Sequence, residues 1–377
     1  MKKALSLLCA AAFLLACTAK APVSQSGLNL QDFENSYNGV PTALYTLTNT
    51  HGMEVCITNF GGRIVSIMVP DRNGDMKDVV LGFDKVQDYF PENNQTDFGA
   101  AIGRYANRIN QGRFSLEGVE YQLPQNNFGH CLHGGPTGWQ YQVYKVEESS
   151  ACHLKLSLVS PDGDNGFPGN VTATVTYTLM EDNSLDIAYE ATTDAPTVVN
   201  MTNHAYFNLS GDPTRSVEDH ILRVNADCYT PVDETLIPTG EIAPVDGTPF
   251  DFREPKAIGR DIAAENTQLA YGRGYDHNWV LGTAGNESRI AASLTCPETG
   301  ITLSIRTSEP GIQIYTGNFL DGTVTGKRGI AYPFRSAVCL ETQHYPDSPN
   351  KEKFPSTVLM PGKSFQSATA YRFSIAQ

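Results

Sequence analysis

Two residues far apart in this chain are of types that exchange protons near neutral pH. His204 lies in MTNHAYFNLSG, residues 201–211, among small, aromatic and amide side chains, and Glu341 ends the apolar run AVCLE, residues 337–341. A free imidazole titrates near pH ~6.5 and a free glutamate carboxyl near ~4.3, so at neutral pH the first can donate a proton while the second accepts one. Alone, each residue also has a structural interpretation, as a hydrogen-bonded core histidine and as half of a buried ion pair. The pair is informative only if the fold brings the two residues together.

Five further polar side chains lie in segments built otherwise from apolar or small residues. Two of them have features of a sugar site, because the carboxylate of Asp276 lies among aromatic residues and the amide of Gln313 can hydrogen-bond to ligand hydroxyl groups. The five are Asn107, Arg108, His133, Asp276 and Gln313. Each has an ordinary alternative, such as a surface charge for the arginine, an Asx turn for the aspartate and the solvated face of a sheet for the glutamine. The composition of AIGRYANRINQG, residues 101–112, also predicts that Arg104 or Arg108 is held against the backbone.

No set of residues has the spacing of a metal or redox site. His130 and His133 form a His-x-x-His pair, but no third ligand lies near them in sequence, and a complete site needs three or four. The eight cysteines are dispersed and include no Cys-x-x-Cys pair, and Cys339, within an apolar run, is predicted to be a buried thiol. We therefore predict no metal and no cofactor. The two glycines after His133 are expected to let a ligand approach the backbone closely.

The elements that must position these side chains are predicted to be β-strands. VTATVTYTL, residues 171–179, alternates apolar residues with four threonines, which is the period of a half-buried strand. The same pattern recurs at 154–158, 185–191, 301–307 and 371–375, with Gly, Pro, Asn and Asp between the strands. Short helices are expected only at 85–93 and 256–266. The fold class is therefore all-β, with one large antiparallel sandwich or barrel.

Side-chain alternation predicts which residues share a face of two of these strands. Val338 and Leu340 should point to one side, and Cys339 and Glu341 to the other. In GIQIYTGNF, Ile312 and Ile314 should likewise lie opposite Gln313 and Tyr315. The polar face of such a strand is either solvated or the lining of a concave site.

The N-terminal residues are predicted to direct export. Residues 1–16 of MKKALSLLCAAAFLLAC have a basic start and an apolar stretch too short to span a bilayer, as in a signal peptide. LLAC resembles a lipoprotein processing site, so Cys17 is the expected lipidation site. Residues 17–36 are expected to be a tether, and 37–377 a single domain. The predicted location is the periplasm or the outer membrane of a bacterium, with membrane contact only through the lipid.

The net charge of -14 is unfavourable for a nucleic-acid partner, since phosphate contacts need clustered lysine and arginine. The sequence does not predict an oligomeric state.

The polar segments, in this order, resemble the aldose 1-epimerase (galactose mutarotase) family. The motifs that carry the resemblance are GRYANRI, LHGG, TNHAYFNL, GYDHN, YTGNF and ETQHYPDSPN. DGDNGFPG and DETLIPTGEIAPVDGTPFDFR add longer support, and the resemblance runs from about Asn38 to the C-terminus. It implies a large twisted antiparallel β-sandwich, the galactose mutarotase-like supersandwich, with an open substrate cleft.

The resemblance also implies an activity and the residues for it. Members interconvert the α and β anomers of free aldoses without cofactor or metal. Carried over by motif, Glu341 is the base and His204 the acid. The sugar contacts fall on Asn107, Arg108, His133, Asp276 and Gln313.

Because His204 must carry a proton when the sugar ring opens, we expect its pKa not to be strongly lowered, with help from carboxylates such as Asp276. Asn203, Tyr206 and Asn208 are candidates for fixing its ring.

Alternative functions remain open at this stage. A non-catalytic sugar-binding lipoprotein of the same fold would not need both His204 and Glu341, and an epimerase could prefer another aldose. A glycoside hydrolase would use Asp276 and Glu341 as paired carboxylates. An epimerase for sugar phosphates should add basic residues, which the net charge disfavours.

Overall fold

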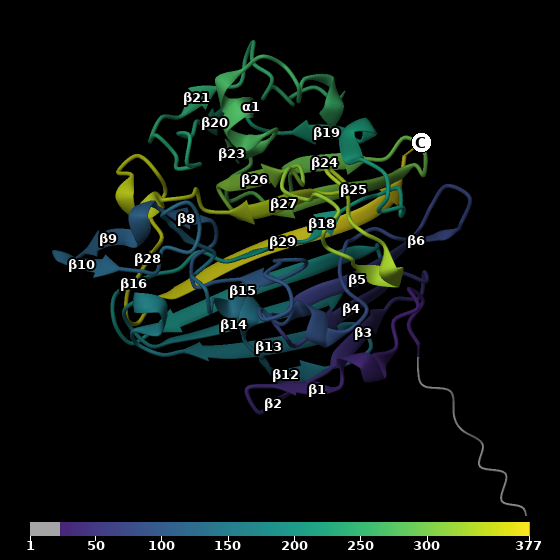
Figure 1. The fold of residues 1–377 in the computed structure, drawn as a ribbon, viewed down its shortest axis with the longest axis horizontal. Helices are drawn as coiled ribbons and strands as arrows, with labels where there is room; N and C mark the ends of the chain where they lie inside the picture. The colour runs from purple at the N-terminus through teal and green to yellow at the C-terminus, as the bar shows by residue number, and fades with distance from the viewer. Residues whose placement is uncertain (1–22, 377) are drawn as a thin grey trace, which may run out of the picture.

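The computed structural model describes residues 23–376 as one β-rich body (Figure 1). The predicted signal peptide and the lipidation site at Cys17 lie outside the described residues. Among the described residues, no helix has the length and apolar character needed to cross a bilayer.

The largest element is a nine-stranded sheet in which all neighbours are antiparallel. In spatial order its strands are β12 (Lys145–Ser149), β13 (His153–Ser160), β14 (Val171–Leu179), β15 (Ser184–Thr193), β29 (Ser364–Ile375), β25 (Ile301–Thr307), β24 (Ala292–Thr295), β19 (Ile221–Val224) and β22 (Lys256–Ala257). The alternating sequence of 171–179 is β14 itself. Its apolar residues are buried and its threonines are not fully buried.

A six-stranded antiparallel sheet carries most of the polar segments singled out above. Its strands, in order, are β18 (Tyr206–Phe207), β27 (Val338–Gln343), β26 (Gly311–Tyr315), β23 (Asp276–Val280), β20 (Cys228–Thr230) and β21 (Ala243–Pro244). A four-stranded antiparallel sheet comprises β3 (Leu44–Thr48), β4 (Glu54–Thr58), β5 (Arg63–Pro70) and β6 (Met76–Asp78).

Five two-stranded ladders complete the strands. They are β1 (Asn35–Tyr37) with β2 (Val40–Thr42), β7 (Ala101–Ile102) with β17 (Thr202–Asn203), β8 (Arg108–Ile109) with β11 (Cys131–Leu132), β9 (Arg113–Leu116) with β10 (Val119–Gln122), and β16 (Thr197–Val198) with β28 (Val358–Leu359). Two of these ladders adjoin polar segments, since β17 precedes His204 and β8 begins at Arg108.

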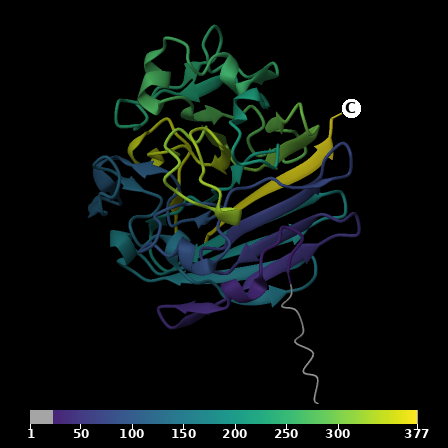
Figure 2. The same ribbon diagram turned by 45° about the vertical axis from the view of Figure 1, so that its right-hand side comes forward.

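One continuous core joins the three sheets. It contains Val175 and Ile187 of the nine-stranded sheet, Ile57 of the four-stranded sheet, and Ile314 and Leu340 of the six-stranded sheet. The two smaller sheets therefore pack on one face of the large one, as in a sandwich. In both views the segment around α1 lies at the opposite end of the molecule from β1 and β2 (Figures 1 and 2). The prediction of a large antiparallel β-sandwich is confirmed.

Helical structure is scarcer than predicted and lies elsewhere. Within 85–93 only the 3₁₀ turn η2 (Val86–Tyr89) forms, because Pro91 disfavours helical backbone at the residue before it. Within 256–266, Lys256 pairs with β19 and only η7 (Ile258–Arg260) is helical. The single α-helix of the described residues, α1 (Thr267–Gly272), begins just beyond, where the side chain of Asn266 caps two backbone N–H groups. The other 3₁₀ turns are η1 (Leu30–Phe33), η3 (Asn110–Gly112), η4 (Trp139–Tyr141), η5 (Asp164–Gly166), η6 (Val217–Asp219), η8 (Lys327–Gly329) and η9 (Ser348–Asn350).

The prediction of a tether over 17–36 is wrong from Val23 onward. Leu28 and Phe33 are buried in a hydrophobic cluster, and the backbone N–H of Gln25 donates to the Glu54 carboxylate. The segment is mostly polar, and its composition did not show that Leu28 and Phe33 pack against the rest of the protein. The described body therefore includes residues 23–36.

Candidate active site

Glu341 reaches the site from β27 with the side-chain alternation that the sequence predicts. Val338 and Leu340 enter the main core, while Cys339 packs in a separate cluster on the other face and Glu341 faces a cavity. On the neighbouring strand β26, Gln313 lies opposite Glu341 in register. The polar face of these strands is thus the wall of a concave site.

His204 stands between the short strands β17 and β18 and meets Glu341. Tyr206 of β18 pairs with Cys339 of β27, which brings the two chain segments side by side. Nε2 of His204 lies 3.5 Å from Oε1 of Glu341, and the side chains are only 7% and 2% exposed. The Tyr206 ring stacks on the imidazole, with centroids 5.0 Å apart. The two candidate proton-transfer groups are therefore neighbours, and both side chains are nearly fully buried.

The cavity beside this pair has a volume of about 360 Å³, within the range of roughly 300–1,000 Å³ that is usual for small-molecule sites. It collects polar and aromatic side chains from loops and strand ends. They are Gln95, Asp97, Asn107, Arg108, Asn127, Phe128, Leu132, His133, His204, Tyr206, Asp276, Tyr315, Phe319 and Glu341. Six of the seven predicted site residues therefore line one space.

The seventh, Gln313, does not line the cavity but supports a residue that does. Its Nε2 donates to Oδ1 of Asp276 at 2.7 Å. Burial raises the pKa of Asp276, while Arg108 and this hydrogen bond oppose the shift. Gln313 therefore fixes the orientation of the Asp276 carboxylate from behind.

Arg108 is fixed by a loop that the sequence did not single out. Its Nε and Nη2 both donate to Oδ1 of Asn127, at 3.2 and 3.1 Å. The guanidinium is buried, and the carboxylates that act on it most strongly are those of Asp276 and Glu341. This arrangement holds one cation over the cavity with its remaining donors free for a ligand.

Asn107 and His133 lie in two tight turns that are joined by hydrogen bonds between these two residues. Both residues have left-handed backbone, with φ 61° and 50°. The backbone N–H of Asn107 donates to Nδ1 of His133 at 3.1 Å, and the N–H of His133 donates to the carbonyl of Asn107. Because Nδ1 is an acceptor, the neutral His133 ring carries its proton on Nε2. Burial and then Arg108 lower the pKa of His133 to about 3, so this ring is neutral near pH 7 and donates through Nε2.

The glycines after His133 have a different role from the one expected. A Cβ on Gly134 would lie 2.3 Å from the carbonyl of Gly103, and one on Gly135 would meet the Asn165 side chain. They permit close packing of loop against loop rather than approach of a ligand.

The expectation about the pKa of His204 is wrong. Burial, with a smaller contribution from His133, lowers it to about 3, and the carboxylate that opposes the shift is Asp97 rather than Asp276. Burial also raises the pKa of Glu341 well above 4.5; Asp276 and Asp97 raise it further and Arg108 lowers it. In the empty cavity each member of the pair therefore favours its uncharged form. Sequence gives no measure of burial, which is the dominant cause.

Of the three residues expected to fix the imidazole, only Tyr206 contacts its ring face. Asn203 donates to the carbonyl of Gly99 and accepts from the N–H of Ala205, which shapes the backbone on either side of His204. Asn208 hydrogen-bonds to the following turn and to Ser336, away from the ring.

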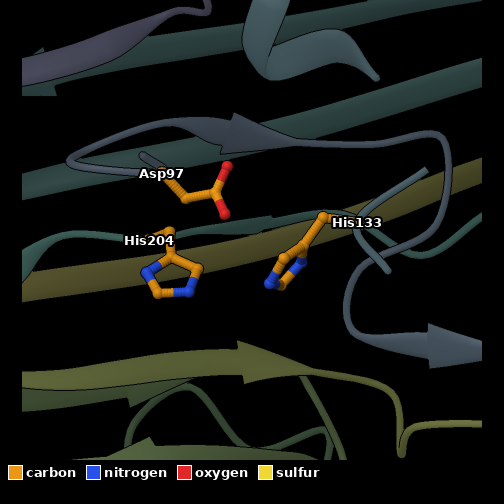
Figure 3. Close-up of side chains that lie close together, drawn as sticks. All are labelled: Asp97, His133 and His204. Carbon is orange, nitrogen blue, oxygen red and sulfur yellow. The ribbon is translucent and has the colours of Figure 1, made fainter. Parts of the chain in front are cut away.

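Asp97, His133 and His204 are the one group among the described residues whose types and spacing could suit a metal ion. One ligand atom from each lies within 4.8 Å of the others, and Figure 3 shows the three side chains around a common space. An imidazole that ligates a metal donates its other N–H to an acceptor. His133 does the opposite, since its Nδ1 accepts from Asn107. The hydrogen bonding of His133 is therefore not that of a metal ligand.

His130, the other half of the His-x-x-His pair, faces away from this group. Its ring nitrogens contact the N–H of Gln111 and the hydroxyl of Thr235.

Arg104 is the arginine held against the backbone, as predicted for its segment. Its two terminal nitrogens donate to the carbonyls of Ser160, Pro161, Pro168 and Gly169 and to the Ser160 hydroxyl. It does not line the cavity, so it braces the loop that carries Asn107 and Arg108.

Comparison with known proteins gives a consistent result. A family model described as Aldose 1-epimerase matches residues 43–372. The chain is 44% identical to galactose mutarotase of Mus musculus over 324 residues, 86% of this chain and 92% of that protein. It is 38% identical to aldose 1-epimerase of Escherichia coli (strain K12) over 339 residues, 89% of this chain and 96% of that protein. Among solved structures, the GalM/aldose epimerase homologue from C. elegans is 34% identical, with a TM-score of 0.82 over 89% of this chain and 100% of that one.

Proposed function

The chain belongs to the aldose 1-epimerase family, and we propose that Glu341 and His204 are the acid–base pair of its reaction. It is an isomerase that interconverts the α and β anomers of aldoses. The observation that carries the residue assignment is the 3.5 Å approach of the two side chains at the wall of the cavity. We propose free hexoses such as galactose and glucose as substrates.

In the proposed reaction the carboxylate of Glu341 accepts the proton of the C1 hydroxyl. Nε2 of protonated His204 donates its proton to the ring oxygen as the bond between C1 and O5 breaks. The open-chain aldehyde rotates about C1–C2. The proton transfers then run in reverse, and the ring closes with the opposite configuration at C1. Each proton that leaves the sugar is returned, so the pair needs one transferable proton and no other reactant.

That proton rests on Glu341 when the cavity is empty, because burial favours the uncharged form of both groups. A bound sugar changes this balance, since hydroxyl groups that donate to Glu341 stabilise its carboxylate. The short separation allows the proton to pass directly to His204. Substrate binding thus prepares the acid and the base together.

The remaining residues are proposed to orient the sugar, and orientation supplies much of the catalysis in a reaction this simple. Arg108 and the Nε2–H group of His133 donate to sugar oxygens, while Asp276, held by Gln313, accepts from hydroxyl groups. Asn107 acts mainly by setting the His133 tautomer.

The cavity favours neutral sugars over sugar phosphates. Among the residues that the structure describes, Arg108 is the only lysine or arginine that lines it, and two of its donor groups already bond to Asn127. A phosphate would need at least one more cation close by.

We further propose that the enzyme works outside the cytoplasm, tethered through a lipid at Cys17. The support is the sequence MKKALSLLCAAAFLLAC alone. Expression in a bacterium of the wild type and of Cys17→Ser tests it, with the mass of the mature N-terminus as the readout. A wild-type protein that keeps residues 1–16 would contradict the proposal. An exported enzyme could also meet pentoses released from polysaccharides.

The test of the reaction is anomer equilibration, followed by polarimetry and NMR on glucose, galactose, xylose, arabinose and one aldose phosphate. Wild type should accelerate equilibration of the free aldoses, and the phosphate should be the poorest substrate. Glu341→Gln should bind sugar but lose most of the rate. A non-catalytic binding protein would fail the first measurement, and release of sugar from glycosides would indicate a hydrolase instead.

The chain offers a matched control for Glu341→Gln. Glu309 is another buried glutamate beside a histidine, with its Oε2 2.6 Å from Nδ1 of His344, and it does not line the cavity. Glu309→Gln should keep the epimerase rate. If both variants kept the rate, the assignment of Glu341 would be wrong.

A further inference from the structure

A third carboxylate, Asp97, faces the catalytic pair from a loop that precedes β7. One of its oxygens lies within 4.8 Å of a ring nitrogen of His204 and of His133, and Figure 3 shows the carboxylate directed toward the space between the two rings. Its Oδ1 is buried and has no hydrogen-bond partner within residues 23–376. We propose that Asp97 is a positioning residue whose negative charge retains the transferable proton on the pair of His204 and Glu341. The inference rests on the proposed function of that pair.

A fully buried arginine fixes the loop that carries Asp97. Nη1 of Arg63 donates to the carbonyls of Thr96 and Phe98, both at 3.0 Å, and Nη2 donates to that of Gln140 at 2.9 Å. Arg63 thus fixes the peptide groups on either side of Asp97 through hydrogen bonds to their carbonyls, and none of these hydrogen bonds involves the Asp97 carboxylate. An arginine without exposed surface is expensive to desolvate, so its use here indicates that the position of this loop matters.

Backbone hydrogen bonds tie the same loop to His204. The N–H of Gly99 donates to the carbonyl of His204 at 3.0 Å, and the N–H of His204 donates to the carbonyl of Ala100 at 2.9 Å. A Cβ on Gly99 would lie 1.9 Å from the carbonyl of Ile64, so only glycine fits at this close approach. The relative position of Asp97 and the imidazole is therefore set by the fold and not by a flexible side-chain contact.

Asp97 differs from the other charged groups around His204 and Glu341 in how it acts on the two side chains. The charged or basic groups that act on the pair of His204 and Glu341 are Arg63, Arg108, His133, Asp97 and Asp276. The uncharged side chains that interact with the pair are Tyr206, Tyr315, Tyr371 and Cys339. Asp276 raises the pKa of Glu341, whereas the carboxylate that chiefly opposes the lowering of the His204 pKa is Asp97. Asp97 raises the pKa of both.

A charge that acts on both members determines when their shared proton is lost. With Asp97 ionised, removal of that proton adds a second negative charge near the first, so it is resisted until higher pH. Without this charge the pair would give up its proton at lower pH and then lack an acid for ring opening. Asp97 thus extends the active form of the enzyme toward alkaline conditions.

The experiment is the pH dependence of kcat/KM for Asp97→Asn, measured by anomer exchange with NMR. The alkaline limb should move to lower pH by about one unit, while activity on the acid side of that limb stays near that of wild type. Asp97→Glu should restore the limb toward its wild-type position. Glu92→Gln, which removes an exposed charge from the same loop, should leave the profile unchanged.

Two outcomes would overturn the inference. An unshifted alkaline limb in Asp97→Asn would show that the charge does not act on the pair, and an equal loss at every pH would show a structural role only. Asp97→Ser provides a second variant if the amide perturbs the loop. Activity retained by Glu341→Gln would instead defeat the proposed function, so the two failures are distinguishable.

Discussion

Glu341 and His204 approach each other to 3.5 Å although no strand pairing joins their own backbones. Their contact depends on β18 lying against β27, which places the turn before Tyr206 over the outward face of Cys339 and Glu341. Neither side chain has a closer hydrogen-bond partner among the described residues, and Oε2 of Glu341 is buried without one. Buried polar atoms without a protein partner at the wall of a cavity are characteristic of groups that bind a ligand.

The first prediction is that the two residues act as a unit. His204→Asn and Glu341→Gln should each lower kcat by about 10²–10⁴-fold, because each removes one of two proton transfers that occur together. The double variant should be little worse than the more damaged single variant. Polarimetry on α-glucose measures all three. Fully multiplicative losses would mean that the residues contribute independently.

The second prediction concerns stability and its dependence on pH. The folded-state pKa of Glu341 is raised above 4.5, so stability is fully present below that pH and falls as pH rises toward the folded-state value. Glu341→Gln removes this penalty. Its Tm should therefore match that of wild type near about pH 4 and exceed it by a few degrees near about pH 8. A difference in Tm that is constant over this range would contradict the pKa direction.

The third prediction separates two arginines of one segment. Arg104→Met leaves several buried carbonyls without donors and should lower the free energy of unfolding by about 3 kcal/mol or more, with kcat/KM near wild type below the unfolding temperature. Arg108→Met should lower the free energy of unfolding by less than Arg104→Met does. It should lower kcat/KM by about 10²-fold, because the substrate is no longer held in position. Chemical denaturation and anomer exchange on both variants provide the check, each serving as the control for the other. Equal loss of kcat/KM in the two would contradict the division.

Side-chain alternation predicted correctly the strands in which apolar and polar residues alternate over many positions. Residues 171–179 and 301–307 are strands with the predicted bounds, because β-branched residues at period two specify one buried face. The ladder of β7 with β17 was not predictable, since two residues are too few to show a period. It nevertheless positions His204. The tether prediction failed for a similar reason, because two apolar residues are a weak signal in a polar segment.

The site was predictable by residue type and motif, but not its electrostatics. Glu341 and Asp276 stand out in sequence because carboxylates are unusual in apolar strands. Asp97 has no such context, and its place beside His204 depends on Arg63, a tertiary contact that no local pattern encodes. The prediction for the pKa of His204 was wrong because burial, which sequence does not report, lowers this pKa more than the nearby Asp97 charge raises it.

The last prediction concerns Phe128, an exposed aromatic residue at the edge of the cavity. Asn127 and His130 exchange both backbone hydrogen bonds around a two-residue turn in which Phe128 has φ 47° and Gly129 has φ 82°. This is a type I′ geometry, which prefers asparagine or glycine at the first position and strains a bulky residue. Phe128 is 61% exposed, so packing does not explain its presence, and strain of this kind is often retained for function.

Phe128→Asn should therefore raise the free energy of unfolding by about 1 kcal/mol and raise KM for the aldose several-fold, with kcat almost unchanged. The matched control is Glu117→Asn, because Glu117 has φ 51° before Gly118 in the turn between β9 and β10 and does not line the cavity. That variant should gain similar stability without a change in KM. Thermal unfolding and progress curves over a range of aldose concentrations measure both quantities. A stabilised Phe128→Asn with the wild-type KM would show that the ring does not contact the sugar.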